Sequence, residues 1–265
     1  MRAVIQFVIA VLVTVAYVTT GTPGVDTTAV TLPHSTDIAS ILPAPGSVVG
    51  IAHPVIVTYR KPVADRSAAE HALGLTSTPA MTGKFEWVEN NVLQWTPSRF
   101  WPAHSTVMLS VEGRSTAFMT GPAVVGVASI SQHTFTVTID GQADPTMPAP
   151  HHLPHQGEPG VLLASMGRPE YATPVATYSV LSKDRDVTMD SSSVGIPVDN
   201  PDGYLLKVDY AVRITRRGLY VHSAPWAVNA MGFENISHGC ISLNPAEAEW
   251  YFNTVHVGDP VIVQE

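Results

Sequence analysis

The stretch Asn235-Ile-Ser-His-Gly-Cys-Ile-Ser-Leu-Asn244 organises the second half of this 265-residue chain. Cys240 within it is the only cysteine of the sequence, and a histidine and a glycine directly precede it. A free thiol has a pKa of about 8.5, so a cysteine nucleophile requires a neighbouring base or positive charge. Either His238 or the more distant His222 could serve as that base. Most lone cysteines are small buried hydrophobes, but this pattern favours a catalytic thiol.

Gly239 adds a second chemical feature to the same motif. Glycine takes backbone torsions that other residues avoid, and it lets the main chain approach a substrate closely. The successive amides of residues 238–240 therefore offer a site for an oxyanion.

The sequence upstream of His222 predicts the strand that positions its imidazole. Apolar residues occupy every second position from Tyr204 to Ile214, and mostly polar residues fall between them. Residues 216–218, Arg-Arg-Gly, then predict a turn that returns the chain to His222. A strand end fixes a side chain more firmly than a loop does. Further on, Asn244-Pro-Ala-Glu247 has the residue types of a helix N-terminus.

Two motifs together carry a family resemblance: Tyr220-Val-His-Ser-Ala-Pro-Trp226 and Ser237-His-Gly-Cys240. They resemble the signature of the L,D-transpeptidases, the YkuD-type enzymes that cross-link peptidoglycan. Three more segments are similar to the mycobacterial branch of that family: Ser165-Met-Gly-Arg-Pro-Glu170, Met189-Asp-Ser-Ser and Gly195-Ile-Pro-Val198. The resemblance is dense over residues 124–263 and looser before them.

The resemblance implies a thioester mechanism with assigned roles. Cys240 would attack the donor stem peptide and release its terminal D-Ala, and an acceptor amine would then form a 3→3 cross-link. His222 corresponds to the base, which the main-chain carbonyl of Ser223 would orient. His238 and Gly239 would support the substrate or the oxyanion. The residues expected to bind substrate are Met189, Tyr204, Trp226, Ser237 and Ser242.

Two features depart from the family pattern. Ser242 stands where the family typically has asparagine. The serine hydroxyl still donates and accepts hydrogen bonds, but its side chain is shorter than that of asparagine. The segment 149–159 is unusual, and its residues His151, His152 and His155 are able in principle to bind zinc. Its prolines favour a surface loop instead, and the family needs no metal, so we expect no metal and no other cofactor.

The resemblance favours an L,D-transpeptidase whose partners are peptidoglycan stem peptides, with carbapenem β-lactams as covalent inhibitors. An L,D-carboxypeptidase, in which water replaces the acceptor, is the near alternative. A non-catalytic wall-binding protein is the alternative from another class. The presence of Cys240, His222 and His238 argues against that last class.

The first half of the chain predicts a separate β-domain. Short β-type runs, split by Pro, Gly and Asn, occupy residues 42–121, which favours an antiparallel sandwich. This part resembles the immunoglobulin-like domain that precedes the catalytic domain in mycobacterial members. The predicted fold class is mainly β, with a YkuD-type β-rich catalytic domain and a few short helices at residues 122–265. Trp87, Trp95 and Trp101 would form either a glycan-binding strip or part of the core, and the core is favoured.

The N-terminus predicts export. In residues 1–29, Arg2 precedes an apolar run, which is typical of a signal peptide. The run is also long enough that an uncleaved membrane anchor is an alternative. Residues 30–41 predict a flexible linker. The expected location is therefore the periplasmic or cell-wall space. The formal net charge of −8 argues against nucleic acid or anionic lipid as a partner.

Overall fold

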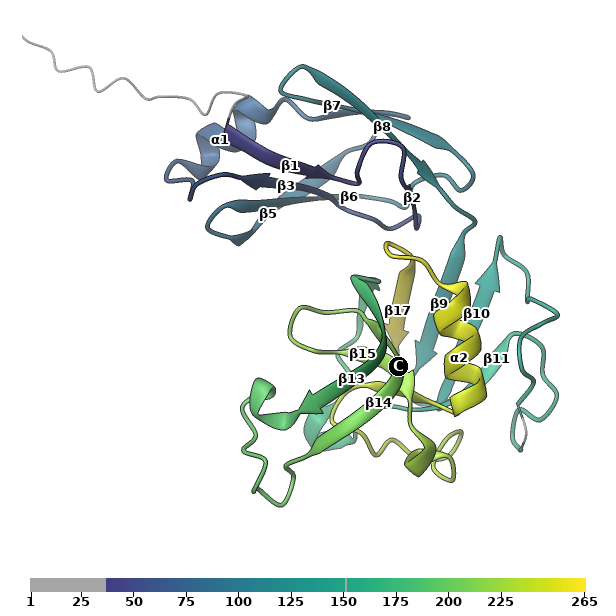
Figure 1. Ribbon diagram of the computed structural model, residues 1–265. Coiled ribbons are helices and arrows are strands. Elements are labelled where there is room, and N and C mark those ends of the chain that lie inside the picture. Colours follow the sequence, from purple (N-terminus) through teal and green to yellow (C-terminus); the bar gives the residue numbers. More distant parts are fainter. Residues whose placement is uncertain (1–36, 151) are drawn as a thin grey trace, which may run out of the picture. The chain divides into compact units, whose positions relative to one another are not determined.

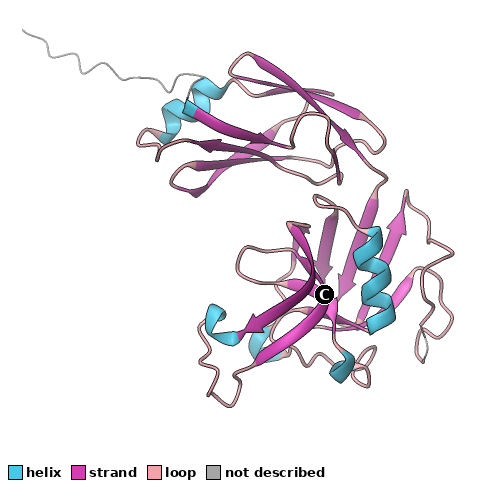
Figure 2. Ribbon diagram, in the orientation of Figure 1, coloured by secondary structure: helices cyan, strands magenta, loops and turns pink. Residues whose placement is uncertain are grey.

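The computed structural model describes residues 37–150 and 152–265. The predicted signal or anchor segment, residues 1–29, and most of the predicted linker lie outside these ranges. The described chain is mainly β, which confirms the predicted fold class (Figures 1 and 2). None of its helices is both long and apolar enough to cross a membrane.

The first domain is a sandwich of two four-stranded sheets. One sheet has the order β1 (Ile38–Leu42), β3 (Val55–Tyr59), β6 (Val92–Pro97) and β5 (Gly83–Glu89). The other has the order β2 (Val48–Val49), β8 (Arg114–Thr120), β7 (Thr106–Val111) and β4 (Thr76–Thr78). Helix α1 (Arg66–Leu73) follows β3 in the chain. Buried and more exposed residues alternate along β3 and β7, as expected when one face of each sheet packs on the other.

Aromatic side chains fill the interior of this sandwich. Trp95 and Trp101 are buried, with ring centroids 6.0 Å apart, and Trp101 also meets Phe118 edge-on at 5.6 Å. Trp87 is half-buried, stacks on Tyr59 at 5.8 Å and donates a hydrogen bond to Glu70. The tryptophans therefore belong to the core, as the sequence favoured.

The second domain is built on a nine-stranded sheet (Figure 1). The strands in sheet order are β12 (Ala176–Ser179), β17 (Pro260–Gln264), β9 (Val124–Ser129), β10 (Thr134–Ile139), β11 (Val161–Ser165), β16 (Ile241–Leu243), β15 (Tyr220–Ser223), β14 (Leu205–Arg213) and β13 (Ser182–Asp190). Short 3₁₀ helices interrupt the connections at η2 (Pro169–Tyr171), η3 (Ser191–Val194) and η4 (Pro225–Ala227). Pairing is antiparallel except between β15 and β16 and between β17 and β9.

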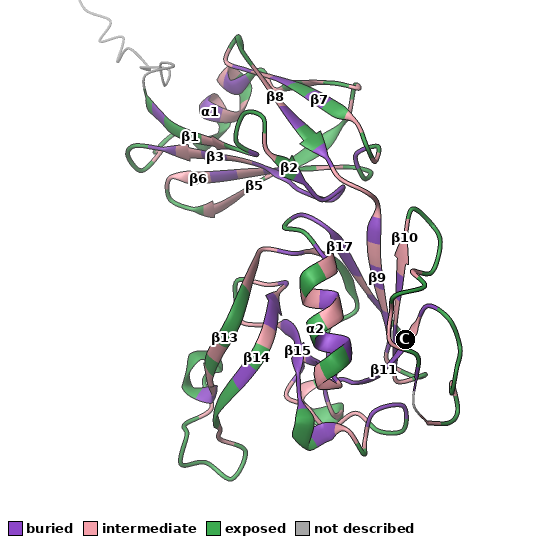
Figure 3. Cartoon of the chain, turned by 45° about the vertical axis from the view of Figure 1, so that its right-hand side comes forward, coloured by how far each residue is buried: buried purple, intermediate pink, exposed green. Residues whose placement is uncertain are grey.

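Helix α2 (Pro245–Thr254) packs on this sheet and begins where the sequence predicted a helix N-terminus. The Asn244 side chain accepts a hydrogen bond from the amide of Ala246 at 3.1 Å, and Pro245 occupies the first turn. Tyr251 is fully buried and meets Phe135 of β10 edge-on, with ring centroids 4.9 Å apart. Figure 3 shows that α2 carries buried, intermediate and exposed residues.

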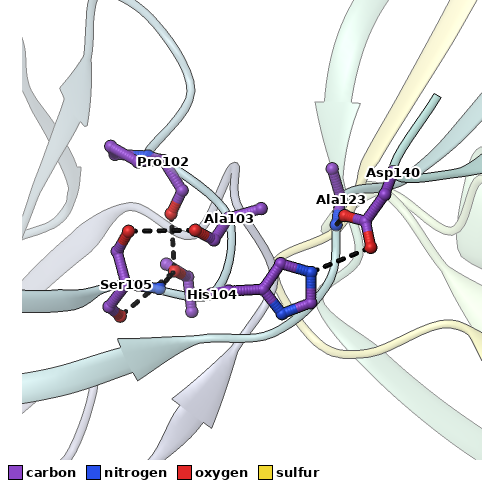
Figure 4. A network of polar contacts seen from close by, with 7 residues as sticks. Pro102, Ala103, His104, Ser105, Ala123 and Asp140 are labelled. Atoms are coloured by element: carbon purple, nitrogen blue, oxygen red, sulfur yellow. Dashed lines mark hydrogen bonds and ion pairs between the residues drawn. The ribbon is translucent and has the colours of Figure 1, made fainter.

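Contacts also join the two domains. His104 of the sandwich hydrogen-bonds through Nε2 to Asp140 at 2.8 Å, and the same carboxylate accepts the amide of Ala123 at 2.9 Å (Figure 4). Both side chains of this ion pair are exposed, so it contributes little stability. The amide of Gly50 donates to the Val257 carbonyl at 2.9 Å. A Cβ on Gly50 would lie 2.0 Å from the amide nitrogen of residue 259, so this approach requires glycine.

Candidate active site

Two neighbouring parallel strands bring the main motif residues together. His222 lies on β15 and is buried, and it is in register with Ser242 of β16. Cys240 directly precedes β16, so the sheet places the cysteine at the strand end beside the histidine. Strand β14, predicted from its alternating pattern, pairs with β15 on the other side.

The His222 ring is held in one orientation by the main chain. Its Nδ1 lies 2.8 Å from the carbonyl oxygen of Ser223. Because a carbonyl only accepts, Nδ1 carries the proton and Nε2 keeps a free lone pair. Burial lowers the pKa of His222, and the bond to the Ser223 carbonyl opposes this in part. The imidazole is therefore neutral near pH 7 and able to accept a proton.

The Cys240 thiol is neutral in this structure. Burial raises its pKa to about 11, while a hydrogen bond from the Tyr220 main chain acts in the opposite direction. The thiol donates to the Gly218 carbonyl, with Sγ and the oxygen 3.8 Å apart. Burial therefore favours a thiol and a neutral imidazole over a thiolate and an imidazolium.

The loop before Cys240 is held by a compact set of hydrogen bonds. Gly239 has φ +118°, which only glycine adopts readily, and its carbonyl accepts from the Thr173 hydroxyl at 2.7 Å. The Ser237 hydroxyl donates to the Cys240 carbonyl at 2.7 Å and accepts the Gly239 amide at 3.1 Å. Of the three amides expected at the oxyanion site, that of Gly239 is therefore engaged. Among the described residues, the amides of His238 and Cys240 donate no main-chain hydrogen bond and remain available.

His238 lies between two tyrosine rings, with centroid distances of 4.8 Å to Tyr171 and 4.9 Å to Tyr204. Burial lowers the pKa of His238, the charge of Arg168 lowers it further, and contacts with Asp202 raise it. Its Nε2 is buried and makes no hydrogen bond within the described structure.

Arg168 and Asp202 form an ion pair beside this histidine. Arg168 Nη2 lies 2.5 Å from Asp202 Oδ1, and the Tyr171 hydroxyl donates to Asp202 Oδ2 at 3.2 Å. None of these three side chains was predicted from the sequence to belong to the site. Arg168 lay within the quoted segment 165–170, but no sequence signal pointed to Asp202.

A cavity of about 180 Å³ joins these elements. It is lined by every residue predicted to bind substrate: Met189, Tyr204, Trp226, Ser237 and Ser242. Cys240, His222 and His238 also line it. Ser223 and Gly239 do not line the cavity, but their carbonyls accept hydrogen bonds from His222 and Thr173. Four apolar lining residues were not predicted: Leu206, Val208, Ala227 and Ile236.

The unusual loop offers no metal site in the part of the chain that the structure describes. His152 contacts the Met231 carbonyl through Nε2 at 2.8 Å and stacks on Phe233. His155 pairs with Glu158. His151 lies outside the described residues. Across residues 37–150 and 152–265, no three His, Cys, Asp or Glu side chains are grouped as metal ligands would be.

The family model of the L,D-transpeptidase catalytic domain (YkuD) matches residues 120–263, and that of a bacterial Ig domain matches residues 18–116. The chain belongs to the L,D-transpeptidase family. The resemblance inferred from the sequence motifs is thereby confirmed.

Relatives in this family match over nearly the whole chain. "Probable L,D-transpeptidase 3" of Mycobacterium tuberculosis (strain ATCC 25618 / H37Rv) is 63% identical over 271 residues, which span 100% of both chains. The crystal structure of L,D-transpeptidase 3 from Mycobacterium tuberculosis with a faropenem-derived adduct shares 66% identity and a TM-score of 0.82, covering 87% of this chain and 99% of that one. An L,D-transpeptidase in complex with imipenem shares 47% identity and a TM-score of 0.77, covering 86% and 98%.

Proposed function

We propose that this L,D-transpeptidase works through a Cys240 thioester and joins peptidoglycan stem peptides by 3→3 cross-links. The observation that carries the proposal is that Cys240 and His222 line one cavity, with His222 on β15 and Cys240 directly before the parallel partner strand β16. The neutral imidazole with a free Nε2 is the form that a general base requires.

In the first half-reaction, Cys240 Sγ attacks the carbonyl carbon that links the third residue of the donor stem to its terminal D-Ala. The thiol proton passes to Nε2 of His222 as the C–S bond forms. The negative charge that develops on the carbonyl oxygen is stabilised by the amides of His238 and Cys240. Collapse of this intermediate breaks the C–N bond, and the departing D-Ala amine takes the proton from His222.

In the second half-reaction, an acceptor amine attacks the thioester carbon. His222 accepts a proton from that amine and returns it to the sulfur as the C–S bond breaks. The product is a new amide between two stems, and Cys240 is again a thiol. Because water competes with the amine, transfer requires that the acceptor is held in position or that water is largely excluded.

The cavity supports exclusion of water on one side. Leu206, Val208 and Ile236 give its wall an apolar character, and Trp226 stands at its rim with about half of its surface exposed (52%). An amine held against this wall would meet less competition from water than it would in open solvent.

The competing function is an L,D-carboxypeptidase, in which water resolves the thioester. Mass spectrometry of the products with a disaccharide-tetrapeptide donor and increasing acceptor separates the two. We expect cross-linked dimer to exceed trimmed tripeptide once the acceptor is saturating. If tripeptide remains the main product there, the protein is a carboxypeptidase.

β-Lactams of the carbapenem class should acylate the same cysteine. The structures of relatives with imipenem and with a faropenem-derived adduct support this expectation. Chemically, the strained β-lactam carbonyl replaces the donor amide carbonyl, and opening of the ring leaves the acyl group on Sγ.

We also propose that the enzyme acts outside the cytoplasm, in the periplasmic or cell-wall space. This proposal is supported by residues 1–29, in which a basic residue, Arg2, is followed by an apolar run as in a signal peptide. Protease accessibility in intact spheroplasts tests the location, because a cytoplasmic protein stays protected until the membrane is lysed.

A further inference from the structure

A second cavity, of about 290 Å³, shares Met189 and Tyr204 with the first. One wall of it is formed by the end of β14, which contributes Arg213, and by the turn to β15, which contributes Arg216 and Arg217. Asp190 is the one acidic residue that lines the cavity, and its Oδ1 already accepts the amide of Ser192 at 2.8 Å. The lining is therefore rich in positive charge directly beside the cavity that holds the nucleophile.

The three arginines are not equivalent. Arg213 donates to the carbonyls of Thr215 at 3.1 Å and of Arg216 at 2.8 Å, so its guanidinium braces the turn itself. Arg216 forms an exposed ion pair with Glu89 of the sandwich at 3.2 Å. Arg217 is exposed, and within the described residues its guanidinium has no hydrogen-bond or ion-pair partner. Arg217 is therefore the cation with all of its donors available to a ligand.

The same turn touches the reacting sulfur. Gly218, which follows Arg217, provides the carbonyl that accepts the Cys240 thiol at 3.8 Å. The guanidinium is thus carried by the residue next to the point where the donor carbonyl must arrive. A group bound by Arg217 would lie on the donor only a few bonds from the bond that is cleaved.

The proposed reaction places one anion at that position on the donor. The residue that is released carries a free α-carboxylate, and this group lies three bonds beyond the scissile carbonyl carbon. A guanidinium pairs with a carboxylate through two parallel N–H···O bonds, which gives direction as well as charge. The neighbouring Arg216 adds positive charge to the same wall.

Resting on the proposed function, we infer that this second cavity is a carboxylate subsite in which Arg217 holds the terminal α-carboxylate of the donor peptide. It would orient the scissile bond against Cys240 and favour donors that end at the released residue. Asp190, already bonded to Ser192, would be a weak competitor for the guanidinium.

The test pairs two donors with four proteins. The donors are a tetrapeptide with a free terminal carboxylate and the same peptide as a terminal carboxamide. The proteins are the full chain, Arg217→Gln, Arg217→Lys and, as a control, Arg99→Gln, which removes an exposed arginine that lines neither cavity. The measurement is kcat/KM for release of the terminal residue, expressed as the ratio of acid to amide donor. Any intrinsic difference in reactivity between the donors is common to all proteins, so only changes in the ratio count.

We expect Arg217→Gln to lower the acid-to-amide ratio about tenfold, the loss typical of one charge-assisted hydrogen bond near the surface. The ratio for Arg217→Lys should lie between those of the full chain and Arg217→Gln, because lysine keeps the positive charge but lacks the paired N–H donors of a guanidinium. Arg99→Gln should keep the full-chain ratio. An unchanged ratio in Arg217→Gln overturns the subsite while leaving the proposed function intact. If the full chain forms no Cys240 thioester with either donor, the proposed function itself fails.

Discussion

Replacement of His222 by glutamine should change the pH dependence of acylation, and not only its rate. The pKa of the Cys240 thiol is raised to about 11 by burial. Since pH 7 lies four pH units lower, about one thiol in 10⁴ is ionised there. Without a base, attack is limited to that small thiolate population. The expected loss at pH 7 is therefore at the upper end of the roughly 10²–10⁴-fold range typical of general-base catalysis.

The two proteins should respond to pH in opposite ways. The pKa of His222 is lowered from 6.5, so its neutral form dominates at pH 7 and above, and the full chain should acylate at a nearly constant rate from pH 7 to 9. Below the lowered pKa, the imidazole is protonated and the rate should fall. In His222→Gln the rate should follow the thiolate fraction, with a tenfold rise per pH unit up to the pKa of the thiol.

The assay is the second-order rate of carbapenem adduct formation by intact-mass spectrometry at a series of pH values. Equal melting temperatures would exclude unfolding as the cause of any loss. His238→Ala serves as the matched comparison and should be less damaging, because His238 packs between two tyrosine rings whereas the Ser223 carbonyl orients His222. A tenfold gain per pH unit in the full chain between pH 7 and 9 would refute the role of His222 as the base. A more damaging His238→Ala variant at equal stability would refute it as well.

Four further outcomes are expected. Cys240→Ser should give no stoichiometric carbapenem adduct by intact mass, because the described chain contains no other thiol. A chain starting at residue 123 should still be acylated by a small β-lactam while working poorly on intact wall; a folded but unreactive fragment would contradict this. Asp202→Asn should slow acylation several-fold, because it breaks the ion pair with Arg168. The double variant Arg168→Asp with Asp202→Arg exchanges the two charges and should restore part of the rate. A purely steric role for either residue would not allow that recovery. Burial raises the pKa of Asp259 to about 7, above its unfolded value, so its contribution to stability is present at acid pH and is lost as pH rises through 7. Melting curves of Asp259→Asn should therefore show the variant gaining stability relative to the native chain between pH 5 and pH 8.

The sequence predicted those parts of the site that depend on local pattern. His222 lies at the end of a strand pair whose alternation is visible between residues 204 and 214, and Cys240 lies in a short motif with its own glycine. Because such signals involve residues close in the chain, the two side chains were assigned to one site without a structure. The capping residues of α2 were readable for the same reason.

The surroundings of His238 were not predictable in this way. Its tyrosine neighbours and the Arg168–Asp202 pair come from segments far apart in the chain, and they meet only after the nine-stranded sheet has formed. No periodic pattern marks Asp202, which lies in the loop before β14. The hydrogen bond from the Cys240 thiol to Gly218 likewise depends on the conformation of a turn.

The raised pKa of the Cys240 thiol also affects how fast this thiol is oxidised. Oxidation of cysteine follows its thiolate character, so a thiol that is almost entirely protonated at pH 7 reacts slowly with oxidants. The proposed location outside the cytoplasm is oxidising, and a single cysteine there has no second thiol in the chain with which to form a protective disulfide. In the proposed mechanism, His222 would activate the sulfur only as it attacks a carbonyl bound in the cavity. Under this proposal, a thiol that is neutral at rest would react slowly with oxidants and still react with a bound donor peptide.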